Sequence, residues 1–157
     1  MNSKVSPLSV LSLPCLLWAS SASAQSVPQG ATCPTLPAES TDALHWVVLR
    51  TDSALLCRAI NTERGNEAFA VTLSQKSPFK PTGSLREEQG NIQGKKLWWY
   101  RTEIAGNRDE LMRETLVKLD SGQVMHVFIR TADSGTMSRY QQLVQSLDFA
   151  PPAIATR

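Results

Sequence analysis

Short runs in which apolar and polar residues alternate occupy most of the chain between residues 43 and 131. This period of two is typical of β-strands, and Gly, Asn, Asp or Ser residues separate most of the runs. Strands are expected at residues 43–50, 54–61, 67–74, 96–104, 111–119 and 123–131, with a short extra segment near Ile92. The links between the first three strands are short, which predicts an antiparallel meander, and Asp120-Ser121-Gly122 predicts a hairpin turn between the last two.

After residue 133 the apolar positions follow the period of a helix. They are Met137, Tyr140, Leu143 or Val144, and Leu147. Asp133 or Ser134 can cap the first turn, and Pro151 and Pro152 prevent the helix from continuing. The glutamines on the other side, which we expect to face water, are Gln141, Gln142 and Gln145.

A run of strands followed by one helix predicts an α+β fold. We expect one domain over residues 43–149, an antiparallel sheet of six to seven strands covered by the C-terminal helix. Residues 25–42 form an irregular N-terminal arm in this interpretation, and residues 150–157 form a tail. Strand 123–131 is apolar on both sides, so both faces of the sheet are expected to be covered at least in part.

Residues 75–91 fit neither period. They contain two prolines and two glycines, and a connection of this length is often functional when it is ordered. Prolines flank Phe79 and Lys80, which limits the conformations that this loop would lose on binding. The loop is therefore a candidate partner-binding segment. The alternative is that Phe79 folds back as a plug over the sheet.

The first 24 residues have the features of a signal peptide. A basic Lys4 precedes the apolar residues 10–18, and Ala22-Ser23-Ala24 is a cleavage signal, so we expect the cut between Ala24 and Gln25. The apolar run is too short to span a bilayer as a helix. The alternative is an ordinary buried apolar segment. Cleavage would leave 133 of the 157 residues, and the expected location is the periplasm, with secretion as the alternative.

Cleavage would also leave two of the three cysteines, Cys33 and Cys57. A pair of cysteines in an exported chain predicts a disulfide bond, which would attach the N-terminal arm to the sheet. Closing a loop of roughly 24 residues stabilises a fold by about 3 kcal/mol. The alternative is a pair of metal-binding or reactive thiols, but no neighbouring residues complete a metal-ligand set.

The charge balance excludes some partners. After loss of Lys4 the chain has 15 basic and 14 acidic residues with interspersed signs, which gives no electrostatic basis for binding nucleic acid or an anionic membrane. No further hydrophobic segment has the length of a membrane span.

No catalytic motif stands out. The sequence has no G-x-S-x-G or H-E-x-x-H motif, and its histidines, His45 and His126, fall on separate expected strands. We therefore expect no catalytic residue, no metal and no cofactor. An enzyme that uses His45 or His126 is an alternative, and it requires one of them to lie in a cleft beside a carboxylate and a hydroxyl.

The residues Trp98, Trp99, Tyr100 and Arg101 form an aromatic and basic strand segment. Because strand side chains alternate, Trp98 and Tyr100 share one face and Trp99 takes the other. The aromatic residues are core if both faces are covered. If one face is open, they form an interface anchor next to Arg101.

The order of these segments resembles the PsbP-like and DcrB-like group of small exported or envelope proteins. The similarity covers residues 67–149 and includes the glycine-led strand 94–100, the turn at residues 120–122 and the final Ser146-Leu147-Asp148-Phe149. It implies an antiparallel sheet sandwiched by helices. Residues 75–91 depart from that pattern because their prolines disfavour the helix that the group often has there. The group has no shared catalytic site, so the resemblance assigns no functional residue.

These observations together predict a small exported protein that acts by binding and not by catalysis. The expected partner is another protein, for example a secreted or envelope hydrolase that this chain would inhibit as an inhibitor or immunity-type protein. A carrier of a small apolar ligand, bound between sheet and helix, is the alternative binding function.

Overall fold

The computed structural model describes residues 31–102 and 110–149. The expected signal peptide, the cleavage site at Ala24 and Gln25, and the C-terminal tail lie outside the described residues. The last part of the strand expected at residues 96–104 also lies outside them.

Seven strands and one α-helix make up the described chain, together with two short 3₁₀ turns. They are η1 (Ala38–Ser40), β1 (Leu44–Arg50), β2 (Ala54–Asn61), β3 (Glu67–Ser74), η2 (Gly83–Leu85), β4 (Arg86–Ile92), β5 (Lys95–Arg101), β6 (Leu111–Lys118), β7 (Val124–Thr131) and α1 (Ser134–Gln145). The strands form one antiparallel sheet, and the expected α+β fold with a helix on the sheet is confirmed.

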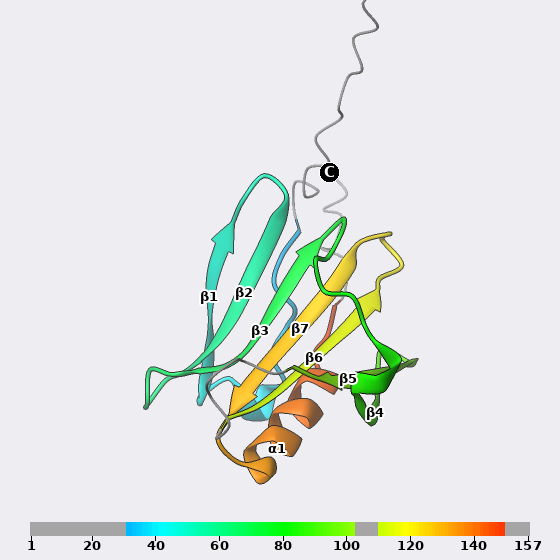
Figure 1. Ribbon diagram of the computed structural model, residues 1–157. Coiled ribbons are helices and arrows are strands. Elements are labelled where there is room, and N and C mark those ends of the chain that lie inside the picture. Colours follow the sequence, from blue (N-terminus) through cyan, green and yellow to red (C-terminus); the bar gives the residue numbers. More distant parts are fainter. Residues whose placement is uncertain (1–30, 103–109, 150–157) are drawn as a thin grey trace, which may run out of the picture.

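The order of strands across the sheet is β1-β2-β3-β7-β6-β5-β4 (Figure 1). Two meanders, β1 to β3 and β4 to β7, therefore meet where β3 pairs with β7. The chain must travel from β3 in the middle of the sheet to β4 at the far edge, and residues 75–85 make this crossing. The long connection that the sequence indicates is therefore a consequence of the topology.

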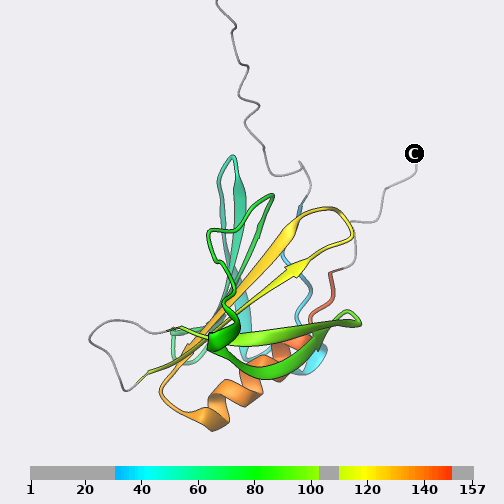
Figure 2. The ribbon, with the colours of Figure 1, turned by 45° about the vertical axis from the view of Figure 1, so that its right-hand side comes forward.

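Helix α1 packs against one face of the sheet (Figure 2). The strand register places buried side chains in rows under it, and one such row is formed by Cys57, Val71, Val127 and Thr115. All four of these side chains are fully buried. Met137, Val144 and Leu147, which the helical period marks as apolar positions, are buried in the same core. Asp133 caps α1 as expected and accepts a hydrogen bond from the Thr136 backbone N–H at 2.7 Å.

The N-terminal arm is attached to the sheet by the Cys33–Cys57 disulfide, as predicted. The two sulfur atoms are 2.04 Å apart and the two Cα atoms are 5.8 Å apart. The indole Nε1 of Trp46 donates a hydrogen bond to the Pro34 carbonyl at 2.8 Å, and Thr35 forms a β-bridge with Asp148. The arm is thus held to β1, to β2 and to the chain just after α1.

Residues 75–91 were expected to be irregular throughout, and this expectation was wrong for their second half. Strand β4 begins at Arg86 and pairs with β5 across a hairpin turn. Gln93 and Gly94 have φ values of 51° and 77°, which a two-residue hairpin turn of type I′ requires. The sequence pattern missed β4 because this strand is at the edge of the sheet and is almost entirely polar.

The expectation that the three helix glutamines face water was also wrong for Gln141, which is 7% exposed. Its side-chain Nε2 donates a hydrogen bond to Glu88 on β4 at 3.2 Å. The Gln145 side-chain oxygen accepts a hydrogen bond from the Asn91 backbone N–H at 2.8 Å, whereas Gln142 is exposed as predicted. Gln141 and Gln145 attach α1 to β4, a strand that the sequence pattern did not reveal.

Candidate functional site

We call the sheet face opposite α1 the helix-free face. The strand register places Tyr100, Glu114 and His126 on this face, on β5, β6 and β7 respectively. Within residues 31–102 and 110–149 no helix covers it, and the crossing segment 75–85 contacts it through Phe79. A helix thus covers one face of the sheet and a loop contacts the other, which agrees with the expectation that both faces are covered at least in part.

A short polar chain runs across the helix-free face. The Thr102 hydroxyl donates a hydrogen bond to Glu114 Oε1 at 2.6 Å, and His126 Nε2 lies 2.6 Å from Glu114 Oε2. Burial raises the pKa of the Glu114 carboxyl, but hydrogen bonds from His126 and Thr102 and the charge of His126 lower it, and the net pKa is below its ordinary value. Glu114 is therefore held as a carboxylate that binds the imidazole in place.

Phe79 stacks on this imidazole. Its ring centre is 5.1 Å from that of His126 with the planes 12° apart, and 5.8 Å from that of Tyr100 in an edge-on arrangement. Phe79 is half-buried and Lys80 beside it is exposed. The structure thus supports the plug alternative for Phe79, and it brings Phe79 and Tyr100 together although they are distant in sequence.

Trp98 extends this aromatic surface. It is partly exposed, it lies on the same face as Tyr100, and the Arg86 guanidinium sits 5.4 Å from the centre of its ring. We refer to Phe79, Trp98, Tyr100 and His126 as the aromatic cluster. Trp99 points to the other face and is 1% exposed, so it belongs to the core and is withdrawn from the candidate partner-binding residues.

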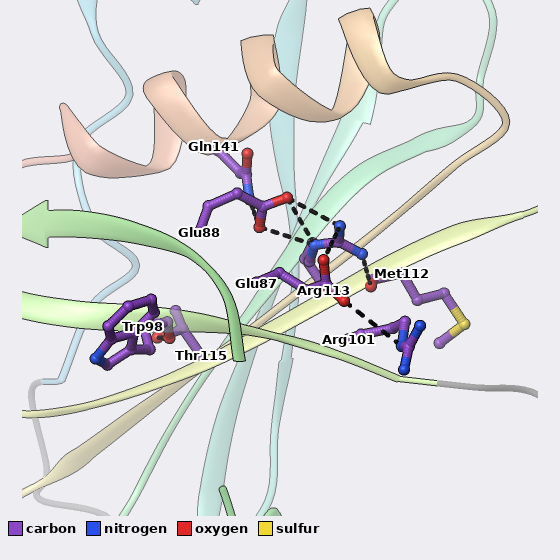
Figure 3. A network of polar contacts seen from close by, with 8 residues as sticks. All are labelled: Glu87, Glu88, Trp98, Arg101, Met112, Arg113, Thr115 and Gln141. Atoms are coloured by element: carbon purple, nitrogen blue, oxygen red, sulfur yellow. Dashed lines mark hydrogen bonds and ion pairs between the residues drawn. The ribbon is translucent and has the colours of Figure 1, made fainter. Parts of the chain in front are cut away.

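A network of hydrogen bonds and ion pairs on the helix side links α1 to strands β4 and β6 (Figure 3). Arg113 forms a two-pronged pair with Glu88, with Nε–Oε2 and Nη2–Oε1 distances of 2.8 and 2.9 Å, and Gln141 contacts the same carboxylate. Burial raises the pKa of Glu88, but hydrogen bonds from Arg113 and Gln141 and the Arg113 charge lower it below its ordinary value. We call Glu88, Arg113 and Gln141 the helix clamp, because they join α1 to β4 and β6.

Arg101 lies at the border of the helix clamp and does not join the aromatic cluster. Its Nε is 3.6 Å from Glu87 Oε1, and Figure 3 shows it on the same side as Arg113. Of the candidate partner-binding residues, Phe79, Trp98 and Tyr100 therefore lie on the helix-free face, with Lys80 next to Phe79 in the chain. Trp99 and Arg101 lie on the helix side.

A second exposed surface follows strand β1 at the sheet edge. Val47, Val48 and Leu49 are 42%, 54% and 57% exposed and are the exposed large hydrophobic residues of the described chain. The sequence pattern located this strand. Because β1 is an edge strand whose hairpin with β2 extends past the core, part of it remains in contact with solvent (Figure 1).

Two grooves lie beside α1, one along its C-terminal half and the other along its N-terminal half. One of about 510 Å³ has Leu44, Tyr140 and Leu143 on its wall together with Arg64 and Arg139, and a second of about 580 Å³ includes Arg58 and Arg130. Neither groove is lined by a histidine. His45 lies 3.5 Å from the Thr62 hydroxyl, and His126 contacts a carboxylate whose other oxygen accepts from Thr102.

No protein-family model, no curated protein and no solved structure matches this chain. In the part of the chain that the structure describes, no group of three or more His, Cys, Asp or Glu residues is arranged to hold a metal ion. No helix among the described residues has both the length and the apolar character needed to cross a lipid bilayer.

Proposed function

We propose that this protein is a small exported domain that binds another protein through the aromatic cluster on its helix-free face. The observation that carries the proposal is the arrangement of partly exposed Phe79, Trp98 and Tyr100 on the one sheet face that no helix of the described chain covers. The Cys33–Cys57 disulfide and the signal-peptide pattern support export.

The chemistry of this surface suits a protein partner. Trp, Tyr and Arg are the residue types enriched where binding energy concentrates in protein interfaces, and here Trp98, Tyr100 and Arg86 lie on adjacent strands. Phe79 is held by its stacking on His126, so the loop that carries it is ordered before a partner arrives. Exposed Lys80 and Arg86 add positive charge around the rings, which favours a partner with acidic residues at its rim.

An inhibitor or immunity-type role against a secreted or envelope hydrolase is consistent with these properties. A rigid sheet with a preordered loop can occupy a partner's surface with little loss of conformational entropy. The partner is therefore sought among exported hydrolases first.

The proposal is tested by capture with the tagged mature chain, residues 25–157, from envelope and culture-fluid fractions, followed by measurement of the dissociation constant for any stoichiometric partner. Trp98→Ala is expected to raise this constant at least about tenfold, because truncation of a central aromatic residue costs about 2 kcal/mol or more. Lys80→Glu is expected to weaken binding as well.

The matched control is Arg139→Glu, which reverses a charge on the exposed side of α1 and leaves the helix-free face unchanged. Equal capture by Trp98→Ala, Lys80→Glu and the unchanged protein would contradict the proposal.

A small-ligand carrier is the second candidate, and the groove of about 510 Å³ favours it because its volume is within the range of ligand pockets. Its apolar wall is formed by Leu44 at the start of β1 and by Tyr140 and Leu143 on the C-terminal half of α1. Native mass spectrometry of the purified protein tests this function. A co-purified small molecule that is lost in Leu143→Glu would support it, and a ligand-free spectrum would oppose it.

A further inference from the structure

The outer side of strand β1 presents backbone groups that no described strand pairs with. Hydrogen bonds from Thr51 N–H to the Ala54 carbonyl and from Thr62 N–H to the Ala43 carbonyl, both 2.9 Å, mark the two ends of the β1–β2 ladder. Hydrogen-bonded and non-hydrogen-bonded pairs alternate in an antiparallel ladder. The backbone N–H and C=O groups of residues 45, 47 and 49 therefore point toward β2. The N–H and C=O groups of Leu44, Trp46, Val48 and Arg50 therefore point away from the sheet.

This edge lacks the features that normally prevent strand pairing. The seven residues of β1 pair with β2 without a register shift, they include no proline or lysine, and their one permanently charged side chain is that of Arg50 at the end. Val47, Val48 and Leu49 are exposed beside the free backbone groups.

The opposite edge of the sheet is protected. Strand β4 carries Arg86, Glu87 and Glu88, and its pairing with β5 is interrupted by a register shift between Arg86 and Gln89. Its Asn91 backbone N–H is already bonded to Gln145 of α1. Charges, an irregular register and a covering helix are the usual means of preventing edge pairing, so the two edges differ in kind.

We propose that β1 pairs with β1 of a second copy of this chain, antiparallel, about a two-fold axis at Val47. In this register all seven residues of each strand are used. Val47 lies opposite Val47 of the second copy, Trp46 opposite Val48, His45 opposite Leu49, and Leu44 opposite Arg50. The outward-pointing backbone groups of residues 44, 46, 48 and 50 then lie opposite those of the second copy, so these residues form the hydrogen-bonded pairs of the new antiparallel ladder.

The positions of the charged residues and the presence of a protected second edge both support a second copy of this chain as the partner of β1. The two copies of Arg50 fall at opposite ends of the joined strands, about 20 Å apart, and each faces a leucine. Pairing covers the exposed Val47, Val48 and Leu49 in both copies. Since β4 is protected, the sheet formed by the described residues has one free edge in each copy, and the assembly closes at two chains instead of growing into a fibre.

This inference goes beyond the proposed function. Edge pairing leaves the helix-free face open, so the dimer and the partner-binding surface are independent, and either can fail without the other. Capture of a partner reports on Trp98, whereas the state of the purified protein alone reports on β1.

The test is site-directed cross-linking of the folded mature chain with its native disulfide intact. Val47→Cys places two thiols directly opposite each other at a non-hydrogen-bonded pair, where a disulfide can form, and it is expected to give a covalent dimer on mild oxidation. Leu49→Cys lies on the same strand and face but opposite His45, and it is expected to remain largely monomeric on a non-reducing gel. Comparable cross-linking of the two variants would overturn the proposed register.

Analytical ultracentrifugation supplies the second measurement. The unchanged protein is expected to be a dimer, and Val47→Lys is expected to raise its dissociation constant roughly tenfold or more, because like charges would face each other across the strands. Gln89→Lys, which adds the same charge to the β4 edge, is expected to leave the dimer unchanged. A monomer at the highest soluble concentration of the unchanged protein would refute the dimer.

Discussion

Two neighbouring residues on β6 show how differently the two faces of the sheet are built. Arg113 points under α1, where it pairs with Glu88 and where Gln141 completes the helix clamp. Glu114 points to the helix-free face, where it binds His126 and Thr102 beneath the ring of Phe79. Both sites join a carboxylate to a basic side chain, but a helix covers the first and a single loop covers the second. The first site therefore stabilises the fold, whereas the second lies beside aromatic side chains that remain partly exposed.

Removal of Arg113 is the largest expected disturbance. Arg113→Ala would leave the Glu88 carboxylate without its basic partner, and we expect the free energy of unfolding to fall by about 2–3 kcal/mol, a value that allows for the partial exposure of Glu88. Urea unfolding measures this loss. Arg58→Ala, which removes an exposed partner of Glu67, is the control and is expected to cost less than about 1 kcal/mol. Equal losses in the two variants would show that the helix clamp is no stronger than a surface pair.

A methyl group at Gly90 is the next largest disturbance of the helix side. A Cβ atom there would lie 2.9 Å from Trp99 Nε1 and 3.1 Å from Gln145 Oε1, so Gly90→Ala is expected to destabilise the fold by about 1–2 kcal/mol. Gly83→Ala is the matched control, since a Cβ atom at Gly83 has no neighbour within 4 Å. Thermal unfolding of the two variants distinguishes them, and an unchanged melting temperature for Gly90→Ala would contradict this close packing.

Loss of the Phe79 ring is expected to affect the helix-free face alone. Phe79→Ala removes the stacking on His126 and should lower global stability by only about 1 kcal/mol, while it releases the crossing loop. Trypsin cleavage after Lys76 measures this release and is expected to become several-fold faster. Lys80→Ala, in the same loop, should leave the cleavage rate unchanged. Faster cleavage in both variants would mean that the ring does not hold the loop.

Acidification is expected to have the smallest effect and to act on both faces. The folded-state pKa values of Glu88 and Glu114 lie below the ordinary 4.5, so each carboxylate stabilises the fold above that pH and loses its contribution as the pH falls through its lowered pKa. The stability difference between the unchanged protein and Glu88→Gln, whose partner Arg113 stays charged, should therefore be constant near neutral pH and shrink in acid. Urea titrations with exposed Glu63→Gln as control test this, and a difference that grows on acidification would contradict it.

The strands that pack under α1 were predictable because burial of one face imposes an alternating pattern. Residues 67–74 are an example, with Phe69, Val71 and Leu73 all buried. Strand β4 was not predictable in this way, since an edge strand made of Arg, Glu, Gln and Asn has no apolar alternation. Gln141 is buried because it contacts Glu88 on β4, so its burial could not be predicted either.

The polar chain on the helix-free face could not be read from the sequence either. Glu114 and His126 are 12 residues apart, and they meet only because β6 and β7 pair in one particular register. The alternation of Trp98, Trp99 and Tyr100 was read correctly. The face that remains open is the one on which α1 does not pack. No local sequence pattern specifies on which face of the sheet α1 packs.

The central claim is that the helix-free face is the binding surface, and hydroxyl-radical footprinting of the complex with a captured partner tests it most directly. We expect the side chains of Trp98, Tyr100 and Phe79 to become protected in the complex, while the partly exposed Tyr140 on α1 keeps the reactivity it has in the free protein. Protection that falls on α1 and leaves Trp98 and Phe79 as reactive as before would contradict it.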